Sequence, residues 1–358
     1  MYFDAHFIFN PFRSRGVFMF VLCLMILCSV RPSFAAEAEA TLQAETTDDS
    51  AIEAAGIVSE HGQLSVASSG FVVDKKQSVF QIQGISTHNL AWYPEYVNVD
   101  TFRKLRDEFN INTIRLAMYT AEDGGYCVSD DTARQQMLAC LTSGIEAAIQ
   151  LDMYVIVDWH ILSDGNPKTN QAQAIAFFQE AAARYANQPG VLYEICNEPN
   201  GNVTWARDIK PYAQAVVTAI RAKAPKSVIL IGSGTWSQDI LDPAKDPVQG
   251  TNLMYTCHFY AGTHGAWLRD RIDSARKLGL PIFISEWGTS AADGSGGVYL
   301  TQSKAWLDFL DARGISWANW SLCDKSETSA ALKPGTNANK TWTTSDLSQS
   351  GQFVFSRF

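Results

Sequence analysis

Two glutamates, Glu198 and Glu286, stand out because each follows a short apolar run that is typical of a buried strand. Glu198 lies in Leu-Tyr-Glu-Ile-Cys-Asn-Glu-Pro (192–199), and Glu286 lies in Pro-Ile-Phe-Ile-Ser-Glu-Trp-Gly (281–288). Two carboxyl groups in different environments can divide the work of breaking a glycosidic bond. One attacks the anomeric carbon, and the other protonates the leaving oxygen and then activates water. The pair therefore predicts this chemistry, provided that the fold brings the two side chains together.

Further polar and aromatic side chains recur at the ends of other strand-like runs, namely Arg115, His160, Asn197, His258, Tyr260 and Trp320. Arg115 could keep Glu286 ionised, Tyr260 could donate a hydrogen bond to it, and Asn197 could donate to a sugar hydroxyl. A single glutamate or histidine at a strand end is often only a solvated or structural group. The recurrence at one end of many strands favours a functional site.

The alternation of short apolar runs with helical patterns predicts how these residues are positioned. We expect buried strands at 81–85, 113–116, 154–158, 191–196, 227–231, 253–259, 281–285 and 316–320. Eight such alternations over about 270–290 residues predict an α/β fold of the (β/α)8 TIM-barrel type, whose active sites lie at the carboxyl ends of the strands. A doubly wound open sheet competes, but it usually carries a glycine-rich phosphate loop that this sequence lacks.

Helical periodicity and short strand patterns complete the predicted elements. Helices are expected at 100–108, 132–151 with Asp131 as the N-cap, 172–186, 205–224, 267–278 and 301–312. Three small antiparallel strands are expected before the barrel, at 64–66, 71–73 and 79–82.

The N-terminal region predicts export. Arg13 and Arg15 precede an apolar run at 16–30, and small residues lead to an expected cleavage site near Ala35 or Ala36. We therefore expect residues 1–35 to be a signal peptide, 36–62 a disordered acidic linker, and 63–358 the catalytic barrel. The protein is predicted to be secreted, extracellular or periplasmic, with no stable membrane association, because the apolar run is short for a membrane span.

Composition narrows the partners. The net charge of −9 without a basic patch speaks against nucleic acid. The 10 tryptophans are compatible with sugar binding, because an indole face can cover the apolar face of a pyranose. No spacing of cysteine and histidine suggests a metal site, so no metal and no cofactor are expected. Cys127 and Cys140 flank a short acidic loop, and whether they pair is left open.

Several motifs together resemble glycoside hydrolase family 5, cellulase family A, and within it the bacterial endo-β-1,4-glucanases of subfamily 2. The motifs are Asn197-Glu198-Pro199, Ser285-Glu286-Trp287-Gly288 and the stretches 84–93, 115–119, 234–239 and 316–322. The resemblance covers residues from about Leu64 to Phe358. One departure is Cys323, where a residue other than cysteine is expected.

The resemblance implies a secreted retaining endo-β-1,4-glucanase whose partner is cellulose or another β-1,4-glucan chain, with a monomer expected by analogy. It implies Glu198 as the acid/base and Glu286 as the nucleophile. The matching active-site shell is Arg115, His160, Asn197, His258 and Tyr260, and the matching substrate-binding residues are His88, Trp92, Tyr119, Trp236, Trp320, Lys325 and Glu327. Trp320 would lie under the sugar being cleaved, Trp236 on the leaving-group side, and the small N-terminal strands would form a hairpin at the barrel bottom.

Two alternatives stay open. A β-mannanase or a xyloglucan-active hydrolase would use the same scaffold and the same pair of glutamates, because these substrates also have β-1,4 backbones. A non-catalytic carbohydrate-binding protein could keep the aromatic cleft, although the intact pair with its shell argues against this.

Overall fold

Eight parallel strands close into a barrel in the computed structural model, which describes residues 56–336 and 342–358. The strand order around the barrel is β10-β3-β4-β5-β6-β7-β8-β9. The strands are β3 Gln83–Thr87, β4 Thr113–Tyr119, β5 Tyr154–His160, β6 Val191–Glu194, β7 Ile229–Ile231, β8 Leu253–Tyr260, β9 Ile282–Gly288 and β10 Trp317–Leu322. The predicted TIM barrel is confirmed.

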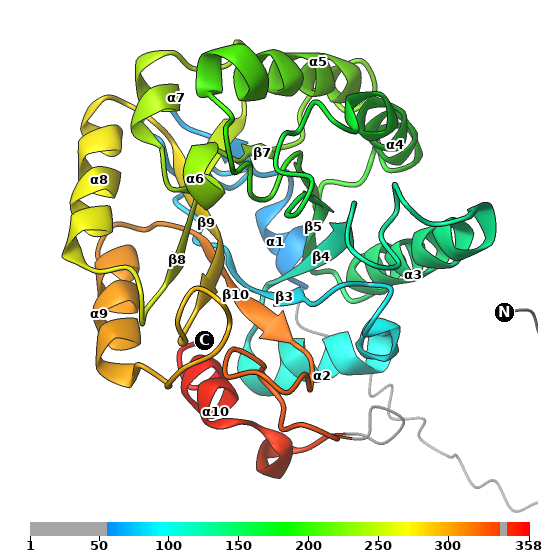
Figure 1. Cartoon of the computed structure of the whole chain (residues 1–358), viewed down its shortest axis with the longest axis vertical. Helices are drawn as coiled ribbons and strands as arrows, with labels where there is room; N and C mark the ends of the chain where they lie inside the picture. Colours follow the sequence, from blue (N-terminus) through cyan, green and yellow to red (C-terminus); the bar gives the residue numbers. More distant parts are fainter. Residues whose placement is uncertain (1–55, 337–341) are drawn as a thin grey trace, which may run out of the picture. The chain divides into compact units, whose positions relative to one another are not determined.

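Helices form an outer ring around these strands (Figure 1). The longer ones are α2 Val99–Phe109, α3 Asp131–Gln150, α4 Gln171–Arg184, α5 Lys210–Arg221, α8 Ala266–Lys277, α9 Leu300–Asp311 and α10 Gln349–Phe355. Short helical segments are α1 Ile57–His61, η1 Pro94–Tyr96, η2 Trp205–Ile209, α6 Gly234–Ser237, α7 Leu241–Lys245 and η3 Thr344–Asp346.

Helix ends follow from local hydrogen bonding. The Asn98 side chain caps α2 by accepting from the backbone N–H of Thr101. Asp130 caps α3 by accepting from the backbone N–H of Ala133 at 2.8 Å, so the prediction that Asp131 is the cap is wrong by one residue. Either aspartate has the right chemistry, and only the backbone angles decide between them. The helix predicted at 205–224 is a π-helical turn, η2, followed by α5.

The region before the barrel differs from its prediction in two places. α1 forms within the segment predicted to be a disordered linker, and it buries Val58 against the barrel. The ordered chain therefore begins before residue 63. β1 Ser65–Val66 and β2 Val72–Val73 form the expected antiparallel hairpin. Val79 makes only an isolated bridge to Val73, so the third small strand does not form. The predicted signal peptide and the linker up to residue 55 lie outside the described residues.

The lower half of the barrel interior is apolar. Leu64 and Val72 of the hairpin region pack into one cluster with inward-facing strand residues, including Tyr154, Ile156, Leu192, Val228, Leu230, Met254 and Phe283. The N-terminal hairpin therefore closes the bottom of the barrel, as the family resemblance implies.

The upper half of the same interior is polar. Successive inward positions on a strand are two residues apart, so Ile156 of β5 is followed by Asp158 and His160. On β6 Leu192 is likewise followed by Glu194. These polar residues are fully or almost fully buried. The inward-facing side chains of these strands thus change from apolar to polar about halfway along the barrel.

Two further features are the state of the cysteines and the length of the apolar helices. Cys127 and Cys140 are free thiols, as are Cys196, Cys257 and Cys323, so the open question of a Cys127–Cys140 bond is answered in the negative. Within residues 56–336 and 342–358, no helix is long and apolar enough to cross a membrane.

Candidate active site

Glu198 and Glu286 meet at the carboxyl ends of the strands. One ligand atom from each of Glu198, His258 and Glu286 lies within 4.8 Å of the others. The two glutamates are 8% and 4% exposed. Carboxyl groups about 5–5.5 Å apart are typical of glycosidases that retain anomeric configuration, because no room is left for a water between them and the sugar. The two carboxyl groups therefore lie close enough together to act on one glycosidic bond.

A change of register between β8 and β9 sets the position of Glu286. Thr256 pairs with Phe283, but His258 pairs with Glu286, so one extra residue is accommodated on β9. Such a bulge re-aims side chains locally. As a result, the neighbouring residues Ser285 and Glu286 both reach the site, although regular alternation would turn one of them away.

Glu286 is held by two donors. Arg115 Nη1 lies 3.2 Å from its Oε2, and the Tyr260 hydroxyl donates to its Oε1 at 2.7 Å. Burial, with Glu198 nearby, raises the pKa of Glu286 to about 7, while His258, Arg115 and Tyr260 act against that rise. Both predicted contacts of Glu286 are therefore present, and they favour its ionised form.

Glu198 ends a chain of hydrogen bonds whose directions can be assigned. Arg115 binds both carboxylate oxygens of Glu194, at 2.7 and 3.1 Å. Ser285 donates its one hydroxyl hydrogen to Glu194 at 2.7 Å, so at 2.9 Å it must accept from His258 Nε2.

The direction of the bond from His258 to Ser285 determines where the proton between His258 and Glu198 lies. Burial lowers the pKa of His258 to about 4, so the ring is neutral near neutral pH. With its hydrogen on Nε2, His258 Nδ1 can only accept, and the proton in its 2.8 Å contact with Glu198 Oε1 belongs to the glutamic acid. Burial also raises the pKa of Glu198 to about 8. Geometry and charge agree that Glu198 is the protonated member of the pair.

A second branch leads from Arg115 to His160. Asp158 accepts from His160 Nδ1 at 2.7 Å, and Asn197 Nδ2 lies 3.1 Å from His160 Nε2. Asn197 Oδ1 accepts from Arg115 at 2.6 Å. The amide nitrogen of Asn197 also donates to the Ile161 carbonyl, so donation to a sugar hydroxyl would require one of these bonds to be exchanged.

Three buried residues of this network, Asp158, Glu194 and Ser285, were not singled out from the sequence. Glu194 stands between Tyr193 and Ile195 in an otherwise apolar strand. A buried carboxylate needs a charged or hydrogen-bonded partner, so a charge inside an apolar run is the signal that could have revealed Asp158 and Glu194.

Aromatic and charged residues from β4, β10 and the loops after β3 and β10 form one cluster beside Glu198 and Glu286. We call this group the aromatic cluster; its members are His88, Trp92, Tyr119, Trp320, Lys325 and Glu327. The His88 ring lies 5.7 Å from Trp92 and 5.0 Å from Trp320, centroid to centroid. Lys325 Nζ lies 2.6 Å from Glu327 and 3.5 Å from His88 Nε2. The structure thus brings all six predicted residues together.

Trp236 lies in a separate hollow. This hollow has a volume of about 500 Å³, and Glu198, His258, Tyr260 and Trp236 are among its lining residues. The backbone N–H of Trp236 donates to the carbonyl of Pro199, the residue after Glu198. The hollow therefore begins at Glu198 and extends to Trp236.

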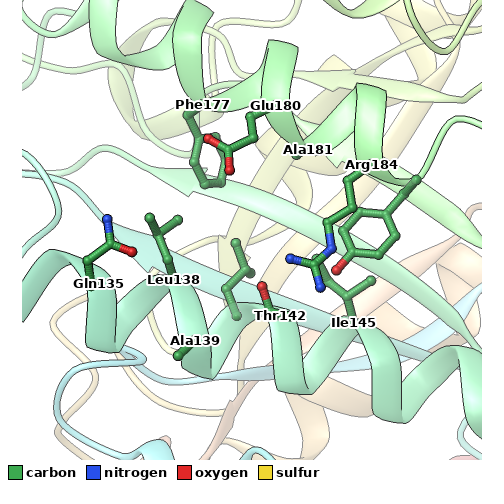
Figure 2. Close-up of a pocket in the computed structure, with 11 residues that line it drawn as sticks. Gln135, Leu138, Ala139, Thr142, Ile145, Phe177, Glu180, Ala181 and Arg184 are labelled. Carbon is green, nitrogen blue, oxygen red and sulfur yellow. The ribbon is translucent and has the colours of Figure 1, made fainter.

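Another hollow, between α3 and α4, lies on the outer helical layer. Figure 2 shows Glu180 and Arg184 of α4 facing Thr142 and Ile145 of α3. Glu180 is the only carboxylate among its lining residues, so this hollow lacks the paired groups that the reaction requires.

Glu198, His258 and Glu286 are also the residues of the described ranges whose ligand atoms lie close enough to hold a metal ion. The sequence predicts no metal here. The chain of donors assigned above accounts for the position of each of these three groups.

Comparison with known proteins agrees with this geometry. A family model described as Cellulase (glycosyl hydrolase family 5) matches residues 73–326. The chain belongs to glycosyl hydrolase family 5. An endoglucanase of Clostridium saccharobutylicum is 51% identical over 293 residues, which are 82% of this chain and 64% of that relative. Endoglucanase 5 of Pectobacterium carotovorum subsp. carotovorum is 51% identical over 297 residues, covering 83% and 57%. This chain thus spans less than two thirds of either relative.

Solved structures of the family share the barrel. Cellulase Cel5C_n superimposes with a TM-score of 0.80 at 41% identity, covering 83% of this chain and 92% of that one. The catalytic domain of Thermobifida fusca endoglucanase Cel5A gives 0.79 at 35% identity, covering 84% and 98%. At these identities the likeness extends beyond fold to the family itself.

Proposed function

We propose that this family 5 protein is a retaining endo-β-1,4-glucanase that cleaves internal bonds of cellulose or soluble β-glucan by double displacement. The observation that carries the proposal is the pair of buried glutamates at two strand ends, one held by cationic and hydroxyl donors and the other protonated against a neutral histidine.

The first displacement uses both glutamates. Glu286 attacks the anomeric carbon and forms a glycosyl ester, while Glu198 gives its proton to the departing glycosidic oxygen. Arg115 and Tyr260 hold the attacking carboxylate, and the Ser285–His258 chain holds the acid.

The second displacement reverses the roles. Glu198, now a carboxylate, takes a proton from a water molecule. The oxygen of that water attacks the anomeric carbon and releases Glu286. Two inversions leave the anomeric configuration unchanged, and Glu198 regains its proton for the next turnover.

A β-1,4-glucan substrate is supported by the relatives named endoglucanases and by aromatic side chains next to the carboxylate pair. We take the aromatic cluster to bind the non-reducing side of the chain, Trp320 to lie under the sugar being cleaved, and Trp236 to lie under the leaving side. Secretion, which the N-terminal sequence predicts, would give the enzyme access to such a polymer.

A substrate panel tests the proposal. Hydrolysis of carboxymethylcellulose is expected to be faster than that of galactomannan or xyloglucan, with rapid loss of viscosity because internal bonds are cut. A dominant rate on galactomannan would overturn the assignment in favour of a mannanase. Binding of cello-oligosaccharides without any product would indicate a non-catalytic carbohydrate-binding protein.

A further inference from the structure

We propose that Trp267, at the start of α8, forms a second aromatic platform on the leaving-group side and binds a glucosyl unit beyond the one at Trp236. This inference rests on the proposed function and extends its substrate site. Sequence motifs do not point to Trp267, which lies at the beginning of an ordinary amphipathic helix.

Trp267 and Trp236 share an unusual exposure within one hollow. They are 47% and 46% exposed, and both line the hollow of about 500 Å³ that begins at Glu198. Among the described residues, the other strongly exposed tryptophan is Trp92, at 40%, in the aromatic cluster. An indole face left in water gains by covering the apolar face of a pyranose, whose hydroxyls stay solvated at the rim. The exposed tryptophans therefore mark a path on both sides of the reacting pair.

Arg271 contacts the Trp267 ring and also binds the segment that carries Trp236. Its guanidinium lies 5.2 Å from the centroid of the Trp267 ring. The same guanidinium donates to the Gln238 carbonyl at 3.0 Å and to Asp239 at 2.9 Å, and Asp239 accepts from the Thr235 hydroxyl. One arginine thus joins α8, which carries Trp267, to the segment that carries Trp236. Fixing both platforms beforehand reduces the entropy that a bound chain would otherwise lose.

Polar groups of the hollow complement the two rings. His264 lies 5.8 Å from Trp267, ring to ring, and its Nδ1 accepts from the backbone N–H of Tyr260. Burial lowers the pKa of His264, so the ring is neutral and its hydrogen is on Nε2, where it can donate to a sugar hydroxyl. Thr263, Gln238 and Asp293 also line the hollow. Aromatic platforms with a few polar groups are what a glucan chain requires.

The two platforms differ in how they are joined to the residues around Glu198. Trp236 is bonded through its backbone to the residue after Glu198, whereas Trp267 is joined to that segment through the Arg271 side chain. We take Trp236 to serve the unit released next to Glu198, and Trp267 to serve a more distant unit. Only substrates with two or more sugar units on the leaving side should reach it.

Substitution Trp267→Ala tests the proposal through substrate length. On cellohexaose we expect kcat/KM to fall by about five- to tenfold, the size of one aromatic contact. On an aryl β-cellobioside, whose leaving group is a single ring, kcat/KM should stay unchanged. Cleavage of reducing-end-labelled cellopentaose should shift toward products with fewer units on the leaving side. Trp267→Phe, which keeps a ring, should recover part of the rate.

Leu278→Ala is the matched control, because it removes an exposed apolar side chain just beyond the other end of α8. It should change none of these values. Equal loss on both substrates, or no loss on cellohexaose from an active parent enzyme, would overturn the distal platform alone. A parent enzyme that does not cleave cellohexaose would instead overturn the proposed function, and the platform with it.

Discussion

The two halves of the barrel interior are built from the same strands, but one is held by apolar packing and the other by a network of buried charges. In the lower half, Ile156 and Leu192 pack with the hairpin in a closed apolar cluster. Two residues further along the same strands, Asp158 and Glu194 are buried and charged around Arg115. The lower half stabilises the barrel by removing apolar surface from water. The upper half holds buried charges that are tolerable only as a complete network.

This difference explains how the buried charges around Glu286 can be held without loosening the fold. Arg115 forms ion pairs with Asp158, Glu194 and Glu286, at 3.0, 2.7 and 3.2 Å. Removing any one carboxylate changes the charge felt by the other two. The lower cluster has no such coupling, because packing between apolar groups depends on volume rather than on charge.

The largest effect is expected at the proposed nucleophile, Glu286. Glu286→Gln should lower kcat on soluble β-glucan by several orders of magnitude, because an amide cannot form the glycosyl ester. Binding of cello-oligosaccharides, measured by calorimetry, should persist, because the aromatic residues are untouched. Normal turnover in this variant would end the assignment of the upper half as the reacting half.

Substitution of the proposed acid/base, Glu198, should give a smaller loss that depends on the leaving group. Glu198→Ala is expected to slow hydrolysis of cellohexaose by roughly 10²–10⁴-fold, the usual contribution of a positioned acid. An aryl cellobioside with a leaving group that needs no proton should be largely spared in the first displacement. Comparing burst and steady-state rates on the two substrates checks this, and equal damage on both would argue against the acid role.

A paired substitution tests the contrast between the halves directly. Arg115→Met leaves buried carboxylates without their cation and should lower the free energy of unfolding by about 3–5 kcal/mol. Leu192→Ala should cost about 2–5 kcal/mol through a cavity. Denaturant unfolding measures both.

Activity per folded molecule separates the two variants. It should be nearly normal in Leu192→Ala and largely lost in Arg115→Met. If Leu192→Ala lost activity as completely as Arg115→Met, the two halves could not be treated as separate in function.

The pH dependence gives the smallest but most specific test. Activity should be greatest between about pH 7 and pH 8, because below this range Glu286 gains a proton and above it Glu198 loses one, given pKa values of about 7 and about 8. The high-pH side should vanish for substrates that need no acid. A profile with its maximum far outside this range would contradict the assigned protonation states.

Ser285→Ala sharpens that test. Without the serine oxygen, the His258 hydrogen can move to Nδ1 and stabilise ionised Glu198, so the high-pH side should move to lower pH. Ser303→Ala, which alters another buried serine on α9, should leave the profile unchanged. Failure of the Ser285 variant to move the profile would contradict the proton chain.

Much of the fold is predictable because parallel strands that are buried on both faces have nearly continuous apolar sequences. The barrel and the positions of Glu198 and Glu286 at strand ends follow from that pattern. The network of Asp158, Glu194 and Ser285 was missed because strand-end reasoning looks beyond the apolar run, whereas these residues lie inside it. Ser285 was further hidden by the register change in β9, which depends on pairing with β8 rather than on local sequence.

Smaller errors have local causes. α1 was assigned to the linker because its composition resembles its acidic surroundings, although Val58 is buried in the barrel bottom. Lys325 and Glu327 were named by resemblance alone, since loop residues after the last strand carry no periodic pattern. The aromatic role proposed for Trp267 required the structure, because exposure and a shared hollow are properties of the folded chain.

The central claim is that Glu286 forms a covalent bond to the sugar while Glu198 manages the proton. Incubation with a 2-deoxy-2-fluoro-β-cellobioside bearing a good leaving group, followed by proteolysis and mass spectrometry, tests it directly. The account predicts one added fluorocellobiosyl group on the peptide that contains Glu286, with none in Glu286→Gln. A label on another residue, or an inverted anomer as the first product of the unlabelled substrate, would contradict it.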